Sequence, residues 1–126
     1  MTSEKKWKAA LESNIILSAH DISDGGLACA ISEMTFGLNI GATIDISEFS
    51  PARPVNKLFA EGGNRILVEV SRERAESFSS IFGSLCRNIG ETGGDRLQIN
   101  DLGIEIIDLP VDKMKEKWEN GLSDLI

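Results

Sequence analysis

The stretch HDISDGGLACAISEM, from His20 to Met34, decides the expected fold because its pattern changes from that of a strand to that of a helix. The apolar run Ile15–Leu17 precedes it and suits a buried strand, which places HDISD at the end of that strand. A helix is expected from Asp24, since apolar residues then recur at i, i+3, i+4 and i+7. Those residues are Leu27, Ala30, Ile31 and Met34. We expect Gly37 to close the helix.

Similar periodicities on both sides of this stretch predict further helices and strands. Alternating apolar residues predict strands, and apolar residues at helical spacing predict helices. The expected strands cover Ala42–Ser47, Arg65–Val70, a segment around Leu97 and Ile99, and Leu102–Leu109. The expected helices cover Ser3–Ser13, with an apolar face of Trp7, Ala10 and Leu11, then Arg72–Gly83, and finally Pro110 to the C-terminus.

The last of these helices carries an apolar stripe that predicts packing against the core, with Trp118 buried at its centre. The stripe consists of Val111, Met114, Trp118, Leu122 and Leu125. A turn is expected at Gly93 and Gly94, so the sheet should contain antiparallel strands. The predicted fold class is therefore α+β, a single mixed, partly antiparallel sheet with packing helices.

Length and composition fit one globular domain over residues 1–126, with 41% apolar residues spread in short runs. A formal net charge of −7 without clustered Lys or Arg opposes nucleic-acid binding. The apolar runs fall far short of the roughly 20 residues that cross a bilayer, so no membrane association is expected. Cys29 and Cys86 lie far apart in the sequence and are interpreted as buried free thiols, in preference to a disulfide or a metal site.

The residues between the first strand and its helix are the candidate binding site. Ser23 or Asp24 can cap the helix, while Gly25 and Gly26 leave its first amides open to an anion such as phosphate. A magnesium ion could bridge that phosphate to Asp21 or Asp24. Capped helices next to glycines are common, so a purely structural cap remains the alternative.

A second polar cluster, Glu61 to Arg65, stands in front of another expected strand. Arg65 can pair with Glu61 or with a carboxylate of the first cluster, and a structural ion pair is the favoured interpretation. His20 is the only histidine and has neither a nucleophile nor a second metal ligand at a recognisable spacing. No catalytic residue is therefore assigned.

Several motifs together resemble a known family. HDISDGGLACAISEM resembles the signature that opens the C-terminal domain of the aminoimidazole ribonucleotide synthetase superfamily, in the form associated with phosphoribosylformylglycinamidine synthases. LFAEGGNRILVEV resembles the Leu-Phe-x-Glu-x-x-x-Arg segment of that family, and IGETGGDRLQI and WENGL resemble its closing region. The resemblance runs from about His20 to the C-terminus and is most specific in its first motif.

This resemblance implies one domain of a cytoplasmic ligase of purine biosynthesis that uses ATP and magnesium. Such an enzyme converts formylglycinamide ribonucleotide to formylglycinamidine ribonucleotide with ammonia from glutamine. Its ATP-binding and catalytic histidine motifs lie in an N-terminal type of domain that has no counterpart here. The chain alone should therefore be inactive and bind no cofactor tightly, and its partners should be that N-terminal domain, sister domains and a glutaminase subunit or domain.

The resemblance also suggests which cleft the chain would line. The catalytic copy of this domain in the family carries Glu-Ser-Gln where this sequence has Glu61, Gly62 and Gly63, and HDISDGG is typical of the second, structural copy. This departure favours a supporting role for Glu61. Two alternatives stay open, namely the corresponding domain of aminoimidazole ribonucleotide synthetase or another ATP-using relative such as selenophosphate synthetase, and a free-standing acidic interaction module.

Overall fold

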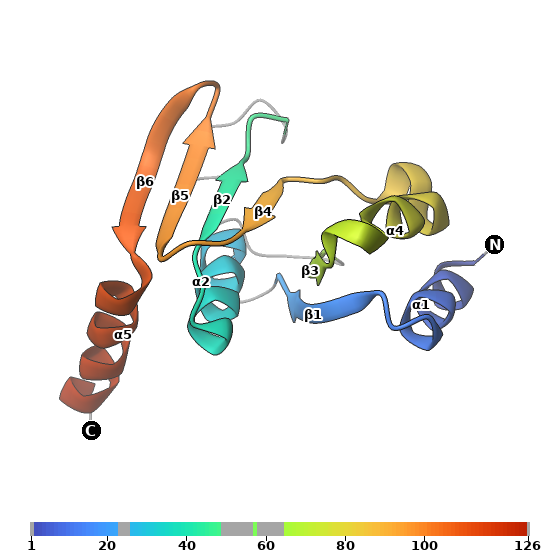
Figure 1. Cartoon of the computed structure of the whole chain (residues 1–126). Coiled ribbons are helices and arrows are strands. Elements are labelled where there is room, and N and C mark those ends of the chain that lie inside the picture. Colours follow the sequence, from blue (N-terminus) through green and yellow to red (C-terminus); the bar gives the residue numbers. More distant parts are fainter. Residues whose placement is uncertain (1, 23–25, 49–56, 58–64, 126) are drawn as a thin grey trace.

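The computed structural model describes residues 2–22, 26–48, 57 and 65–125. Helices and strands alternate irregularly along the chain and gather into two sheets with helices beside them (Figure 1). The order is α1 (Ser3–Glu12), β1 (Ile16–Asp21), α2 (Gly26–Leu38), β2 (Ala42–Asp45), β3 (Ile66–Val70), η1 (Arg72–Arg74), α4 (Ala75–Phe82), η2 (Gly83–Leu85), β4 (Gly90–Thr92), β5 (Arg96–Asp101), β6 (Ile104–Pro110) and α5 (Val111–Leu125).

The larger sheet has four strands in the order β4-β2-β5-β6. The central pair β2–β5 is parallel, with Ile44 opposite Ile99, and the two outer pairs are antiparallel. Alternation along β2 and β5 directs Ala42, Ile44, Leu97 and Ile99 into the core, where the buried side of α2 meets them. The predicted strands at Ala42–Ser47 and around Leu97 and Ile99 are thereby confirmed.

The smaller sheet is an antiparallel ribbon of β1 and β3. Its register places His20 opposite Leu67 and Asp21 opposite Ile66, and a bulge interrupts it between Ile16 and Ser18. The α+β class and the mixed sheet are confirmed, but the expected single sheet is wrong because the strands divide between two sheets. The alternation of apolar and polar residues shows which side chains of a strand are buried, but it does not show which strand lies beside it. The division of the strands between two sheets could therefore not be predicted from the sequence pattern.

Helix α2 supplies the centre of the core. Its four predicted core residues are buried, and Leu27 and Ile31 are fully so. The expected end at Gly37 is wrong, since the helix continues to Leu38 and Asn39 then adopts a left-handed φ of 52°. Asn tolerates this conformation better than most residues, so it can end a helix as Gly does.

Helices α1 and α4 meet through aromatic side chains at the end of the molecule that lies away from α5 (Figure 1). The ring of Phe82 lies 5.0 Å from that of Trp7 and 4.6 Å from that of Phe78, measured between centroids. Gly83 follows Phe82 with a φ of 57° and ends α4 as expected. Leu11, by contrast, was expected on the packed face of α1 and is 62% exposed.

Among the side chains of the C-terminal helix that the structure describes, those of the first turns pack against the core. Val111 is buried and Met114 packs against the core, but Trp118 is 53% exposed, so its predicted burial is wrong. Figure 1 shows α5 running on beyond β6, where Trp118 has only the ring of Phe36 as an aromatic neighbour, at 5.8 Å, among the described residues. Pro110 is the last residue of β6 rather than a residue of the helix. Within the described ranges, no helix combines the length and apolar character that a membrane span requires.

Candidate functional site

The candidate site from the sequence lies at one end of the β1–β3 ribbon. Asp21 is the last residue of β1 and is exposed, and its partner across the ribbon is Ile66. One residue further, the N–H of Ile22 donates to the carbonyl oxygen of Arg65 at 3.0 Å. Arg65, which immediately precedes β3, thus lies at the same end of the ribbon as Asp21 but opposite Ile22, and α2 begins shortly afterwards at Gly26.

Gly26 starts the described part of α2 and is buried. Its φ of 69° lies in the left-handed region, where a side chain would be strained, so the sequence needs glycine here for the backbone conformation itself. This requirement is independent of any ligand. The backbone conformation therefore explains why Gly26 is a glycine, and the binding of an anion at the N-terminus of α2 remains a prediction.

Four of the seven predicted site residues fall outside the described residues, so the structure does not test them. They are Ser23, Asp24, Gly25 and Glu61. The proposed helix cap and the Arg65–Glu61 ion pair therefore remain predictions. The side chain of Arg65 is half-buried.

His20 lies on the inner face of the ribbon, half-buried and opposite Leu67. Across the described part of the chain, no three His, Cys, Asp or Glu side chains approach closely enough to hold a metal ion. Of the two predicted magnesium ligands, Asp21 and Asp24, the structure describes Asp21. An exposed carboxylate at the end of a strand suits a magnesium ion that takes its remaining ligands from phosphate and water.

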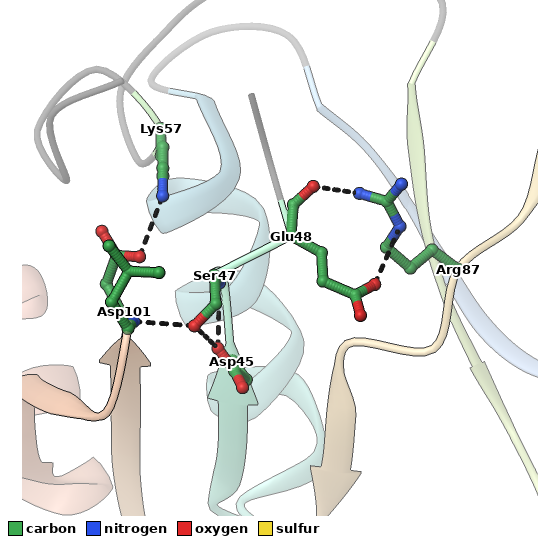
Figure 2. A network of polar contacts seen from close by, with 7 residues as sticks. Asp45, Ser47, Glu48, Lys57, Arg87 and Asp101 are labelled. Carbon is green, nitrogen blue, oxygen red and sulfur yellow. Dashed lines mark hydrogen bonds and ion pairs between the residues drawn. The ribbon is translucent and has the colours of Figure 1, made fainter. Parts of the chain in front are cut away.

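The structure reveals a second polar site that the sequence did not predict, at the carboxyl ends of β2 and β5. Lys57 Nζ lies 2.9 Å from Asp101 Oδ1, and both side chains are almost fully buried, at 3% and 5% exposure (Figure 2). Asp101 continues the inward alternation of Leu97 and Ile99, which was the available signal. A carboxylate in phase with core residues needs a cationic or hydrogen-bonding partner.

Next to this ion pair, Ser47 joins the end of β2 to the β5–β6 turn. Its backbone N–H donates to Asp45 Oδ1 at 2.9 Å and its hydroxyl donates to the same oxygen at 2.5 Å, while Ser47 Oγ accepts from the N–H of Leu102 at 2.7 Å. The side-chain hydrogen bond from Ser47, followed by the backbone one, holds the pKa of Asp45 below its ordinary value of 3.8.

Glu48 extends the same network toward the loop before β4. Arg87 Nη1 donates to the carbonyl oxygen of Glu48 at 2.6 Å, and Arg87 Nε lies 3.4 Å from Glu48 Oε2 (Figure 2). The groups of this network satisfy one another, so its evident role is to fix the loops at this end of the sheet. The exposed carboxylate of Asp21 at the ribbon end is the better candidate for a ligand.

Comparison with known proteins identifies relatives for this arrangement. A family described as "AIR synthase related protein, C-terminal domain" matches residues 3–101. The phosphoribosylformylglycinamidine synthase subunit PurL of Thermoplasma acidophilum is 45% identical over 116 residues, which are 91% of this chain and 15% of that protein. The corresponding subunit of Thermoplasma volcanium is 48% identical over 112 residues, 88% of this chain and 15% of that protein. The chain thus spans about 15% of the length of these relatives.

Solved structures of PurL from Thermotoga maritima share the fold. The structure complexed with ATP superposes with a TM-score of 0.76 at 19% identity, and the structure complexed with FGAR with 0.77 at 18% identity. Each match covers 88% of this chain and 20% of the other. A structure of PurLQS from the same organism matches with a TM-score of 0.74 at 19% identity, covering 85% of this chain and 20% of the other. At this identity the likeness establishes the fold.

Proposed function

Because the chain belongs to the AIR synthase related protein C-terminal domain family, we propose that it is one domain of a phosphoribosylformylglycinamidine synthase. The observation that carries this proposal is the identity to the two Thermoplasma PurL subunits, which extends over about nine-tenths of the chain. The whole enzyme is then an ATP-dependent ligase of purine biosynthesis, at work in the cytoplasm. It replaces the amide oxygen of formylglycinamide ribonucleotide by nitrogen, with ATP phosphorylating that oxygen and ammonia displacing it.

Within that enzyme, the ribbon end forms part of the wall of a nucleotide or phosphate cleft. Asp21 faces solvent there, Arg65 precedes β3 at the same end of the ribbon, and Gly26 starts the helix whose first amides follow. Ser23, Asp24, Gly25 and Glu61 complete the proposed set on sequence grounds. Asp21, with Asp24, would hold a magnesium ion that neutralises phosphate charge when it is bound.

The chain needs partners to complete the reaction. ATP and the catalytic histidine belong to an N-terminal type of domain, and ammonia comes from a glutaminase subunit or domain. The existence of a PurLQS structure among the relatives supports an assembly of several components. The role of this chain is then to shape the cleft and support its sister domains, so the chain alone lacks turnover.

The test compares the 126-residue chain with the longer polypeptide that contains it. ADP release that requires both formylglycinamide ribonucleotide and ammonia is expected from the longer polypeptide and not from the chain alone. If the longer polypeptide instead consumes formylglycinamidine ribonucleotide, the aminoimidazole ribonucleotide synthetase alternative is correct. ATP turnover with neither substrate would contradict both assignments.

The site is tested separately with Asp21→Asn in the longer polypeptide. Loss of the carboxylate should weaken binding of ADP with magnesium about tenfold, while the melting temperature stays unchanged because Asp21 is exposed. Glu73→Gln, an exposed carboxylate in η1, is the control and should leave nucleotide affinity unchanged. Equal affinities for Asp21→Asn and Glu73→Gln would remove Asp21 from the site.

A further inference from the structure

The β1–β3 ribbon has two faces of opposite character, and their placement is unusual. The inner face, against which α2 packs, carries Ser18, His20 and Glu69 beside the buried Leu67. The hydroxyl oxygen of Ser18 is buried there without a hydrogen-bond partner among the described atoms. The ribbon therefore turns much of its polar character inward.

The outer face is mostly apolar. By register it is formed by Ala19, Asp21, Ile66 and Val68, and it is extended by Leu17, which lies within the bulge, and by Val70, which pairs with Ile16. Leu17 is 60% exposed and Ile66 47% exposed, Ala19 is exposed, and Val68 and Val70 are half-buried. A sheet with one solvated face normally directs its polar residues to water, so this ribbon has the pattern of a strand pair that is covered on its outer side as well.

The size of this face indicates what covers it. Six residues of strand at about 3.3 Å each and two strands about 4.8 Å apart give a face of roughly 20 by 10 Å, or about 200 Å². A standard interface between separate proteins buries about 800 Å² on each partner. A second copy of the chain would therefore bind this face weakly, whereas a domain on the same polypeptide is present at an effective concentration of about millimolar and needs little area.

We propose that the outer face of the β1–β3 ribbon is the apolar centre of a docking surface for a covalently linked neighbouring domain. This inference rests on the proposal that the chain is one domain of a longer enzyme, whose relatives are more than six times as long as the matched segment. The single charge on the face, Asp21, lies at its end. Docking at this face would bring the neighbouring domain beside Asp21 and the end of the ribbon, which is where a shared cleft has to form.

The docking surface is tested by the reactivity of single cysteines with a maleimide. Both native cysteines are first replaced by serine, and Leu17→Cys or Ala19→Cys is introduced into the 126-residue chain and into the longer polypeptide. Leu85→Cys is the matched control, because Leu85 is 68% exposed and lies in η2, away from the ribbon. Because Ala19→Cys changes the side-chain volume only slightly, it measures the accessibility of the outer face even if Leu17→Cys disturbs the fold.

Labelling at Leu17→Cys and Ala19→Cys should be at least about tenfold slower in the longer polypeptide than in the chain alone, because a docked domain blocks access to the thiol. Leu85→Cys should react at similar rates in both. Equal rates at the ribbon positions, or equal protection at Leu85→Cys, would overturn the proposal. Protection that rises with the concentration of the short chain would instead identify a second copy as the occupant. Labelling does not require turnover, so failure of docking and failure of the proposed activity are distinguished.

Discussion

Replacing Asp101 by Asn should destabilise the protein far more than the loss of an ordinary ion pair. Lys57 and Asp101 lie 2.9 Å apart with 3% and 5% of their side chains exposed. Asp101→Asn keeps the size of the side chain but leaves the ammonium of Lys57 buried without a counter-charge. An uncompensated buried charge of this kind costs about 3–5 kcal/mol of unfolding free energy.

The change is measured by urea denaturation at neutral pH. With an m value of about 1.5–2 kcal/mol per molar, a loss of about 3–5 kcal/mol lowers the urea midpoint by about 1.5–3 M. Arg72 and Glu91 provide the control, since they form an ion pair of nearly the same length, 3.0 Å, with 81% and 70% of their side chains exposed. Glu91→Gln should cost less than about 1 kcal/mol.

A double replacement separates the ion pair from the packing around it. Lys57→Met combined with Asp101→Leu removes both charges and keeps the volume, so it should recover most of the stability that Asp101→Asn loses. A midpoint for Asp101→Asn within the error of that for Glu91→Gln would refute the reasoning. Such a result would mean that the ammonium of Lys57 reaches water when its partner is removed.

The remaining predictions concern a carboxylate, two glycines and a tryptophan. Hydrogen bonds from Ser47 hold the pKa of Asp45 below 3.8, so the ionised carboxylate stabilises the fold above that pH, and this contribution is lost as the pH falls through the lowered pKa. Ser47→Ala should raise the pKa of Asp45 in an NMR titration. An unchanged pKa would contradict the assignment. Gly37→Ala should stabilise the protein by about 0.5–1 kcal/mol in thermal unfolding, since a Cβ there meets no atom within 4 Å. Gly41→Ala should destabilise it instead, because a Cβ at Gly41 would overlap neighbouring backbone atoms; a destabilising Gly37→Ala or a stabilising Gly41→Ala would contradict the packing described. Trp118→Ala should cost well below the roughly 3–5 kcal/mol of a buried aromatic residue, and a loss in that range would show that Trp118 is buried in solution.

Local periodicity was sufficient to locate most of the elements. Burial repeats every second residue in β2 and β5 and every third or fourth in α2, and apart from Thr35 and Asp101 those positions carry apolar residues or glycine, so the sequence records them directly. β4 was missed because Gly90–Thr92 is too short to show any period. Trp118 was misjudged because an apolar stripe does not tell how far along a helix the core extends; Val111 is buried at the start of α5, whereas Trp118 is exposed.

The polar sites were harder to predict, for a physical reason. Asp101 can be recognised in the sequence because it continues the alternation of the core residues Leu97 and Ile99. Its partner Lys57 is 44 positions away, in a segment without alternating apolar residues. Pairing between distant residues depends on the topology, which alternation does not encode. At the ribbon end, the candidate site came from resemblance to a family rather than from spacing, and the structure adds that the register of β1 and β3 places Asp21 opposite Ile66, next to Arg65 in the chain.

The arrangement of the larger sheet also sets the order in which it can assemble. β5 and β6 are joined by a two-residue turn, Leu102–Gly103, whose φ angles of 52° and 79° suit a tight hairpin, so this pair forms through local contacts. β2 is central, yet both of its partners in the described sheet come after residue 89. Closing the long loop between β2 and β4 is slow compared with the formation of a hairpin. β2 therefore inserts late between β4 and a β5–β6 hairpin that is already formed, and the folding rate should depend more on the hairpin turn than on the side chains of β2.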